Sequence, residues 1–382
     1  MMDRGAMQDA VEAYDPKKLE LACVASHSGL DVYDGATDEG MPNIAIAQEG
    51  RSAVYDRFFK KTASGRGAVD ECWTYPKYNG IMAPDQQQRL RDRNVVWVPN
   101  RAWTSYCSID ACEDDFAVPM IGSRNLLRSE EREEQQDYYW LLEKAGMPFP
   151  KKIDHYNDIE QLSIVKLHHS QKPLERGFFT CASTEEFHEK AQKLIAQGVI
   201  DEPSLETARI EEYVIGPVFN FNFFYSPVNK ANGEEPLELL GIDWRFESSL
   251  DGHVRIPAPQ QMTLPDHQMI PEMTVVGHNT ATVRESLLGK VFDLGEQWVK
   301  AAEEHYNPGI IGPFCLQTCV DKDMNFFIYD VAPRIGGGTN VHVGMGHPYG
   351  NALWRTQMST GRRVAREVKM AASEGLLREI VT

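Results

Sequence analysis

Residues 314–340 read FCLQTCVDKDMNFFIYDVAPRIGGGTN, and this stretch decides the fold class. Gln317 ends one apolar run, Asp330 ends the next, and the polar turn DKDMN separates the two runs. The pattern predicts a β-hairpin that presents two oxygen ligands, followed by Arg334, three glycines and Asn340. Oxygen ligands on paired strands, beside an arginine and a glycine-rich turn, suit Mg²⁺ and a nucleoside triphosphate.

The length and charge of the chain narrow the class of protein. With 382 residues the chain is too long for one ordinary hydrophobic core, so about two or three domains are expected. The 39 basic residues against 56 acidic ones give a formal net charge of −17. That charge, without a basic stripe, argues against nucleic acid as a partner. Anionic small molecules remain compatible, because a pocket needs only local arginines, lysines and backbone N–H groups.

Membrane and export signals are not visible in the sequence. Apolar runs fall short of the ~18 residues of a membrane helix, and the polar N-terminus, MMDRGAMQDAVEAYD, lacks the apolar core of a signal peptide. The seven cysteines show no disulfide framework and no zinc-ligand spacing. We therefore expect reduced thiols, a cytoplasmic location and no membrane partner.

The first part of the chain predicts an α/β unit. Residues 19–25 (LELACVA) form an expected buried strand, the polar residues Ser26, His27 and Ser28 follow at once, and a short helix continues to Asp38. Strand, polar loop, helix and strand make a βαβ unit, whose ligands bind at the carboxyl ends of the strands. Further strands are expected at 42–48, 94–100 and 116–122.

After this unit the pattern changes to alternating strands and helices. A helix over 129–146 is expected to stop at Gly146, and a second helix is expected to have Thr184 as its N-cap. Strands are predicted at 162–167, 177–183, 208–216, 218–226 and 237–247, with a hairpin loop at 229–236. A long helix is expected over 284–305, and the basic helix 360–373 is expected to lie on a solvated or subunit-facing surface.

Lys166 and a charged strand lie in the order that a nucleotide ligase uses. Lys166 ends a short strand, and Glu211, Glu212, Tyr213 and Val214 follow ~45 residues later. In such enzymes a strand lysine reaches the phosphates, while a hinge offers backbone groups to adenine and a carboxylate to the ribose. Taken alone, either feature is more often a solvated surface charge.

Longer strings of sequence carry a resemblance to a known family. The chain resembles the archaeal-type formate-dependent ligase of purine biosynthesis, 5-formaminoimidazole-4-carboxamide ribonucleotide synthetase, over about residues 18 to 375. The strings that carry it, besides the hairpin at 314–340, are ASHSGLDVYDGA (25–36), VPMIGSRNLLR (118–128), IEEYVIG (210–216), GIDWRFESSLDGHVRIPA (241–258), VRESLL (283–288) and IGPFCLQ (311–317).

The resemblance implies an ATP-grasp fold and an activity. The expected architecture is a parallel α/β substrate-binding domain (1–125), followed by two α+β ATP-grasp subdomains, a small one with the phosphate loop (126–216) and a C-terminal one with the metal site (217–382). The implied enzyme uses ATP and Mg²⁺ to join formate to the 5-amino group of AICAR (5-aminoimidazole-4-carboxamide ribonucleotide). Formation of a homo-oligomer is expected, since relatives of this kind tend to assemble.

The resemblance also assigns roles to residues. Arg334 and Lys166 are the expected catalytic residues, and Gln317 with Asp330 the metal ligands. Substrate binding is assigned to Ser26, His27, Ser28, Arg255, Arg284, Glu285 and Asn340. Arg334 and Asn340 are expected to contact the γ-phosphate or the acyl phosphate. ATP binding is assigned to Lys166, Arg176, Glu211, Glu212, Tyr213 and Val214. Arg284 fits equally well as a solvated charge that begins a helix.

The chain departs from the family pattern in three places. The loop after Lys166, HHSQKPLERGFF (168–179), lacks the expected glycines, and Pro173 removes a backbone donor. Ala102 stands where the family has a small hydroxyl-bearing turn, and Asp330 stands where many ATP-grasp proteins have Glu. Two alternatives therefore stay open: a sibling ligase with a different acid or amine, and a nucleotide-binding relative without turnover.

Overall fold

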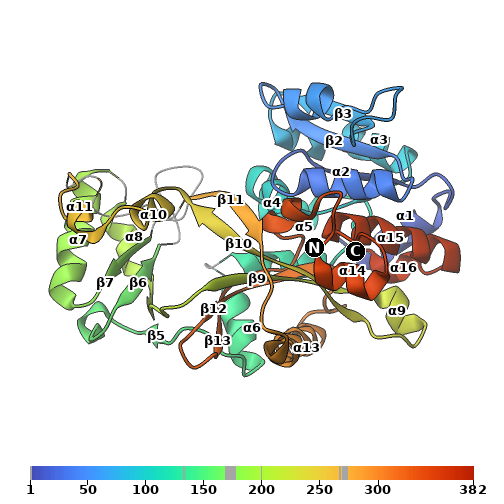
Figure 1. Cartoon of the computed structure of the whole chain (residues 1–382). Helices are drawn as coiled ribbons and strands as arrows, with labels where there is room; N and C mark the ends of the chain where they lie inside the picture. Colours follow the sequence, from blue (N-terminus) through green and yellow to red (C-terminus); the bar gives the residue numbers. More distant parts are fainter. Residues whose placement is uncertain (1, 132–133, 168–177, 199, 266–267, 269–273) are drawn as a thin grey trace.

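The computed structural model describes residues 2–131, 134–167, 178–198, 200–265, 268 and 274–382. Three β-sheets organise these residues (Figure 1). The N-terminal sheet lies beside the central sheet, and the third, smaller sheet lies at the opposite end of the molecule (Figure 1). Within the described ranges, no helix is both long and apolar enough to cross a membrane.

The N-terminal sheet has the order β3-β2-β1-β4, and all of its strands are parallel. Two expected strands are confirmed as β1 (Glu20–Val24) and β2 (Asn43–Gln48), and the third as the shorter β4 (Val95–Trp97). The fourth expected strand is wrong: residues 116–122 make two isolated bridges, from Met120 to Trp97 and from Ile121 to Val381. The fourth strand of the sheet is instead β3 (Glu71–Tyr75), at the opposite edge beside β2, and its sequence ECWTY has only a weak alternation.

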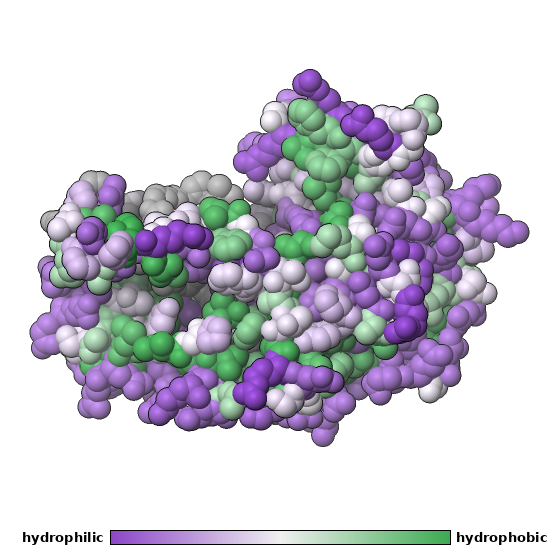
Figure 2. Space-filling model, viewed as in Figure 1, coloured by the Kyte–Doolittle hydropathy of each residue, from purple (hydrophilic) through white to green (hydrophobic). Residues whose placement is uncertain are grey.

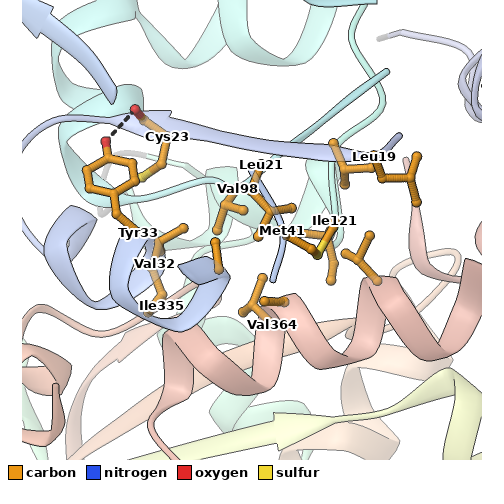
Figure 3. Packing of buried hydrophobic residues seen from close by; sticks show 14 of the residues in the cluster. Leu19, Leu21, Cys23, Val32, Tyr33, Met41, Val98, Ile121, Ile335 and Val364 are labelled. Carbon is orange, nitrogen blue, oxygen red and sulfur yellow. Dashed lines mark hydrogen bonds between the residues drawn. The ribbon is translucent and has the colours of Figure 1, made fainter. Parts of the chain in front are cut away.

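The C-terminal helix α15 (Thr360–Glu374) packs on the N-terminal unit rather than facing solvent. Val364, Ala365, Val368 and Ala371 recur at helical spacing and enter the same core as α2 (Gly29–Asp38). Figure 3 shows Val364 in the same cluster as Val32, Met41 and Ile335. The expected solvated surface is therefore wrong, because the basic residues of α15 mask an apolar stripe.

The small sheet has the order β5-β8-β6-β7 and is antiparallel throughout. Its strands are β5 (Lys152–Ile153), β6 (Ser163–Lys166), β7 (Phe178–Cys181) and β8 (Arg209–Glu212). Helix α7 (Thr184–Ala196) packs against it. The N-cap of α7 is Ser183, whose hydroxyl accepts a hydrogen bond from the Glu186 N–H, so the predicted cap at Thr184 is one residue late.

The central sheet has the order β11-β10-β9-β12-β13, with antiparallel pairing. Its strands are β9 (Val218–Tyr225), β10 (Leu237–Glu247), β11 (Val275–Thr280), β12 (Gly312–Val320) and β13 (Phe326–Ala332), so the hairpin predicted from 314–340 is confirmed. One face is apolar and lies under α13 (Leu288–His305) and α6 (Tyr138–Lys144). Since side chains alternate along a strand, the residues between those core positions point to the other face.

Several expected elements are shorter or differently built. The helix predicted over 129–146 is reduced to α6, although Gly146 follows its end with a φ of 64°, as predicted for a C′ glycine. The long helix begins with η5 (Glu285–Leu287) before α13. The first residues of the loop expected at 229–236 belong to a short helix, α9 (Pro227–Ala231). The other helices are α1 (Arg4–Glu12), η1 (Val54–Phe58), η2 (Tyr78–Met82), α3 (Pro84–Asp92), α4 (Arg101–Cys107), α5 (Ile109–Asp114), η3 (Arg124–Glu130), η4 (Tyr156–Asp158), α8 (Glu202–Glu206), α10 (Ser248–His253), α11 (Ala258–Gln261), η6 (Gly337–His342), α14 (Pro348–Trp354) and α16 (Leu377–Ile380).

The surface mixes hydrophilic and hydrophobic residues, as Figure 2 shows, and the N-terminal unit rises above the rest of the molecule in that view. Val54, Phe58 and Phe59 are exposed hydrophobic residues of this unit.

Candidate functional site

A cavity of about 180 Å³ lies between the small sheet and the central sheet. Lys166 and the hinge residues 211–214 line it from one side, and Asp330 lines it from the other. The structure therefore brings together residues that are more than 100 positions apart in the sequence. Further lining residues are Pro150, Ile164, Gly216, Val218, Arg245, Glu247, Cys319 and Tyr329.

Lys166 is buried and tied to the hinge by an ion pair. Its Nζ lies 2.5 Å from Glu211 Oε2 and 2.7 Å from the Tyr139 hydroxyl. Arg209 also pairs with Glu211. Burial alone would raise the pKa of the Glu211 carboxyl, but the charges of Lys166 and Arg209 hold it below its ordinary value.

This network changes the role expected of Glu211. Its side chain has no exposed surface and is held by two cations, so it is a poor partner for ribose hydroxyls. Glu212 is half-buried and lines the cavity, where its carboxylate accepts hydrogen bonds from the Lys151 N–H and the Gln161 amide. Of the two hinge carboxylates, Glu212 is therefore the better candidate for the ribose.

Gln317 and Asp330 are direct partners across the β12–β13 hairpin. Gln317 Nε2 lies 3.3 Å from Asp330 Oδ2, so the two predicted metal ligands meet. In the described part of the chain, no group of three or more His, Cys, Asp or Glu residues is arranged to hold a metal ion. One carboxylate and one amide oxygen still fit Mg²⁺, which usually takes one or two protein carboxylates and completes its shell with water and phosphate.

Arg334 leaves the hairpin and is buried beside it. Its guanidinium donates to Glu130 Oε1 at 2.6 Å and to the Ile335 carbonyl at 2.9 Å. The buried Nε of Arg334 has no hydrogen-bond partner. A buried N–H without an acceptor is costly, so this atom suits an anionic ligand such as a phosphate.

The loop of Ser26, His27 and Ser28 lies at the carboxyl end of β1, as predicted. His27 has a φ of 56°, which is strained for a non-glycine residue, and its Nδ1 lies 3.1 Å from Ser28 Oγ. Burial lowers the pKa of His27 well below its ordinary value, and the positive charges of Arg334 and Arg101 lower it further. The imidazole is therefore neutral and can serve only as a neutral donor or acceptor.

Asn340 holds this loop in place. Its Nδ2 donates to the His27 carbonyl at 2.7 Å, and its Oδ1 accepts the Asp31 N–H at 3.2 Å. Both ends of the amide are engaged with the start of α2 and the loop before it. The described contacts of Asn340 are therefore with this loop, and its contact with a phosphate stays a prediction.

Three other predicted site residues are not brought to this region. Arg284 lies against Met324 at the far turn of the hairpin, and Arg284 and Glu285 are exposed at the start of the segment that leads into α13. Because α13 covers the apolar face, both lie at the wrong face of the sheet to meet His27, and the alternative of a solvated charge fits Arg284 better. Arg255 is exposed after α10, and among the described residues no side-chain contact links it to the other candidates.

Arg176 and the departing loop at 168–176 lie outside the described residues. Ala102 is buried in α4 and packs in the core of the N-terminal unit. Arg101 beside it pairs with Glu130 and Glu131, which links α4 to the residue that also holds Arg334.

Sequence reasoning missed a second polar cluster on the same face of the central sheet. Its members are Asn220, Asn222, Asp243, Arg245 and His278. The signal was present, because asparagines alternate with phenylalanines in VFNFNFFY and charged residues alternate in the second half of LELLGIDWRFE.

Comparison with known proteins supports one family. Residues 186–382 match a family described as a domain of unknown function (DUF1297), and residues 21–153 match a protein of unknown function (DUF1246). A protein from Methanopyrus kandleri named 5-formaminoimidazole-4-carboxamide-1-(beta)-D-ribofuranosyl 5'-monophosphate synthetase is 37% identical over 382 residues, which are 100% of each chain.

Solved structures resemble the chain over most of its length. The IMP biosynthesis protein PurP from Thermococcus kodakaraensis has a TM-score of 0.70 and 27% identity, covering 95% of this chain and 100% of that chain. The N5-carboxyaminoimidazole synthetase from Staphylococcus aureus, solved with ADP, has a TM-score of 0.56 and 10% identity, covering 92% of this chain and 77% of that chain. The second likeness concerns the fold alone.

Proposed function

The chain belongs to the 5-formaminoimidazole-4-carboxamide ribonucleotide synthetase family, and on this premise we propose that it is an ATP-dependent ligase that joins formate to the 5-amino group of AICAR. The predicted ATP-grasp fold is confirmed by the likeness to PurP and to N5-carboxyaminoimidazole synthetase. The products are the formamido ribonucleotide, ADP and phosphate. Full-length similarity to a synthetase of this name is what supports the substrate pair.

One structural observation carries the site. We propose that the cavity of Lys166 and Asp330 and the loop of His27 belong to one site with Arg334 between them, because Arg334 lies close enough to His27 to lower its pKa. Burial raises the pKa of the Cys315 thiol, the charge of Arg334 opposes this effect and that of Asp330 adds to it, so Cys315 lies near both residues. A phosphate near Arg334 would therefore lie between a nucleotide in the cavity and a substrate at the loop.

The chemistry follows from the poor reactivity of formate. A formate oxygen attacks the γ-phosphorus of ATP, the bond to the β-phosphate oxygen breaks, and ADP leaves with that electron pair. The amine nitrogen then attacks the carbon of formyl phosphate, and phosphate leaves. The protein must hold ATP, formate and AICAR in line, and it must keep water away from formyl phosphate, which is a mixed anhydride.

The residues of the chain suit these tasks. We propose that Lys166 and the unpartnered Nε of Arg334 bind phosphate oxygens, and that Glu212, Tyr213 and Val214 bind the nucleoside. Gln317 and Asp330 would hold Mg²⁺, which screens phosphate charge when bound. Ser26, neutral His27 and Ser28 would orient the ribonucleotide at the end of β1.

The proposal also covers the partners, the cellular location and the oligomeric state of the enzyme. We propose small-molecule partners, a cytoplasmic location and a homo-oligomer. All seven cysteines are free, which suits a reducing compartment. The exposed apolar side chains of Val54, Phe58 and Phe59 are compatible with a subunit contact.

A direct assay tests the reaction. The protein is incubated with ATP, Mg²⁺, formate and AICAR, and both ADP and the formylated ribonucleotide are followed. We expect ADP and product in equal amounts, with neither appearing when formate or AICAR is withheld. ADP release that needs neither substrate contradicts this activity. Tight ATP binding without turnover on any acid and amine favours the nucleotide-binding alternative, and product only with another acid or amine favours a sibling ligase.

A further inference from the structure

A buried carboxylate sits at the centre of the missed polar cluster. Asp243 on β10 has no exposed surface, and its two oxygens accept hydrogen bonds from Asn220 Nδ2 at 2.8 Å and from Asn222 Nδ2 at 2.6 Å. The carbonyl oxygens of both asparagines are buried without a partner. Burying a carboxylate and two asparagine side chains costs free energy when some of their oxygens have no hydrogen-bond partner. Such a cost suggests that these residues serve a function rather than stability.

His278 faces this carboxylate from the edge strand β11. Its Nε2 lies 4.0 Å from Asp243 Oδ2, and about 20% of its side chain is exposed. None of the described residues hydrogen-bonds Nδ1 of His278. Nε2 of the ring therefore lies toward a carboxylate, and Nδ1 is available to a ligand. A histidine that acts as a general base and is oriented by a carboxylate has this arrangement.

The glycine segment after Arg334 brings this pair next to the substrate loop. A Cβ at Gly338 would overlap the Asp243 carboxylate, and a Cβ at Gly337 would lie 2.8 Å from His27 Nε2. Only glycine allows the backbone to approach both groups so closely. Asp243 and His27 thus lie on two sides of one short segment, and His278 is close enough to His27 to influence its charge.

The amide-forming step needs a proton acceptor at this place. As the carbon–nitrogen bond forms and the carbon–oxygen bond to phosphate breaks, the phosphate leaves with the electron pair and the amine nitrogen must lose a proton. His27 is a poor acceptor, since it is buried beside Arg334 and Arg101, which disfavour a second positive charge. Burial and Arg245 also lower the pKa of His278, but the Asp243 carboxylate opposes them, and among the described residues no carboxylate acts on His27 in this way.

We propose that His278 accepts the proton that the attacking amine loses, and that Asp243 positions the imidazole and stabilises the imidazolium. This inference rests on the proposed function, since it names the base of that reaction. The proton then passes to solvent, to which His278 is partly exposed.

The charges around His278 support a neutral resting state. Burial lowers the pKa of His278, Asp243 opposes that effect, and Arg245 on the same strand as Asp243 adds to it. Burial also raises the pKa of Asp243, although the hydrogen bonds from its two asparagines counteract this. Two further titratable groups lie near this strand. His27, in the loop after β1, interacts electrostatically with His278, and His342 on η6 has its Nε2 3.5 Å from the hydroxyl of Thr280, two residues along β11 from His278.

The test uses His278→Ala in the full-length protein, with His305→Gln as the control. His305 is exposed at the end of α13, behind the apolar face. We expect kcat for the formylated product to fall by about 10²–10⁴-fold in the alanine variant. Binding of ATP and of AICAR, each measured by calorimetry, should change less than about threefold. Added imidazole should restore at least about tenfold of the lost rate, with rescue increasing as pH rises through the pKa of free imidazole.

Each result decides the question. A kcat within about twofold of the unmodified protein overturns the assignment, and so does a loss of turnover that imidazole does not rescue at any pH. Loss of substrate binding together with turnover also overturns it, because that marks a structural role. Failure of the unmodified protein to make the formylated product is a different result, and it sinks the proposed function itself.

Discussion

The buried ion pair of Lys166 and Glu211 allows a prediction about which partner matters more for stability. Lys166→Met removes one cation and leaves Glu211 paired with Arg209. Glu211→Gln removes the only anion of the three and leaves two cations buried around an amide. Arg209 cannot easily move away, because its guanidinium lies 3.5 Å from the centre of the Tyr139 ring.

The two costs differ by enough to measure. For Lys166→Met the loss is that of charge-assisted hydrogen bonds, about 1–3 kcal/mol, because the remaining pair is neutral overall. For Glu211→Gln the loss is that of an uncompensated buried charge, about 3–5 kcal/mol. The expected difference of about 2 kcal/mol corresponds to a factor of about 30 in the unfolding equilibrium constant.

Urea unfolding followed by circular dichroism measures the ranking, and Lys152→Met supplies the control. Lys152 lies on the neighbouring strand β5 with an exposed partner, Asp154, so its replacement should change stability by less than about 0.5 kcal/mol. A Lys166→Met variant as unstable as Glu211→Gln, or less stable, would refute the reasoning. That outcome would mean that Arg209 does not compensate Glu211.

Two further predictions concern the hairpin and the response to acid. Asp330→Ala should abolish turnover, while the midpoint of thermal unfolding stays within a few degrees. The control is Asp323→Ala, in the exposed turn of the same hairpin, which should leave activity intact. Unchanged activity in Asp330→Ala would remove Asp330 from the site. Burial lowers the pKa of His342 to about 3, so the folded state binds a proton at this histidine less readily than the unfolded state does. The stability that neutral His342 contributes is therefore fully present above about pH 6.5 and declines as the pH falls toward 3. The decline should approach about 1.4 kcal/mol per pH unit, and His342→Gln should flatten it in acid unfolding curves; an unchanged slope contradicts the assignment.

The sequence predicted the elements whose pattern is local. The 314–340 hairpin, the strands β9 and β10 and the helix α15 follow from alternation, helical spacing and turn residues that lie within one segment. Within the candidate site, the meeting of Gln317 and Asp330 was predictable because a hairpin fixes which residues face each other across its strands.

The rest depended on contacts between distant segments. The sequence around Glu211 does not indicate that both Arg209 and Lys166 form ion pairs with its carboxylate. Strand pairing alone predicts only that Lys166 lies opposite Arg209. Asn340 looked like a phosphate contact because it follows a glycine turn, but its partner is the His27 carbonyl, 313 residues away. The packing partner of the apolar stripe of α15 was not predictable from local sequence either, because α2 lies more than 300 residues earlier in the chain.

Polar residues at alternate positions of a core strand are a local sequence signal for the polar cluster on the central sheet. Phenylalanines surround Asn220 and Asn222 in β9, and Asp243 belongs to the run of charged residues that alternates along β10. A polar side chain on a core strand costs free energy unless it is paired, so two adjacent strands that both bear such positions imply a polar layer between them. Here that layer includes the carboxylate against which Gly338 and His278 lie, so the alternation points to the face of the proposed site before any family resemblance is considered.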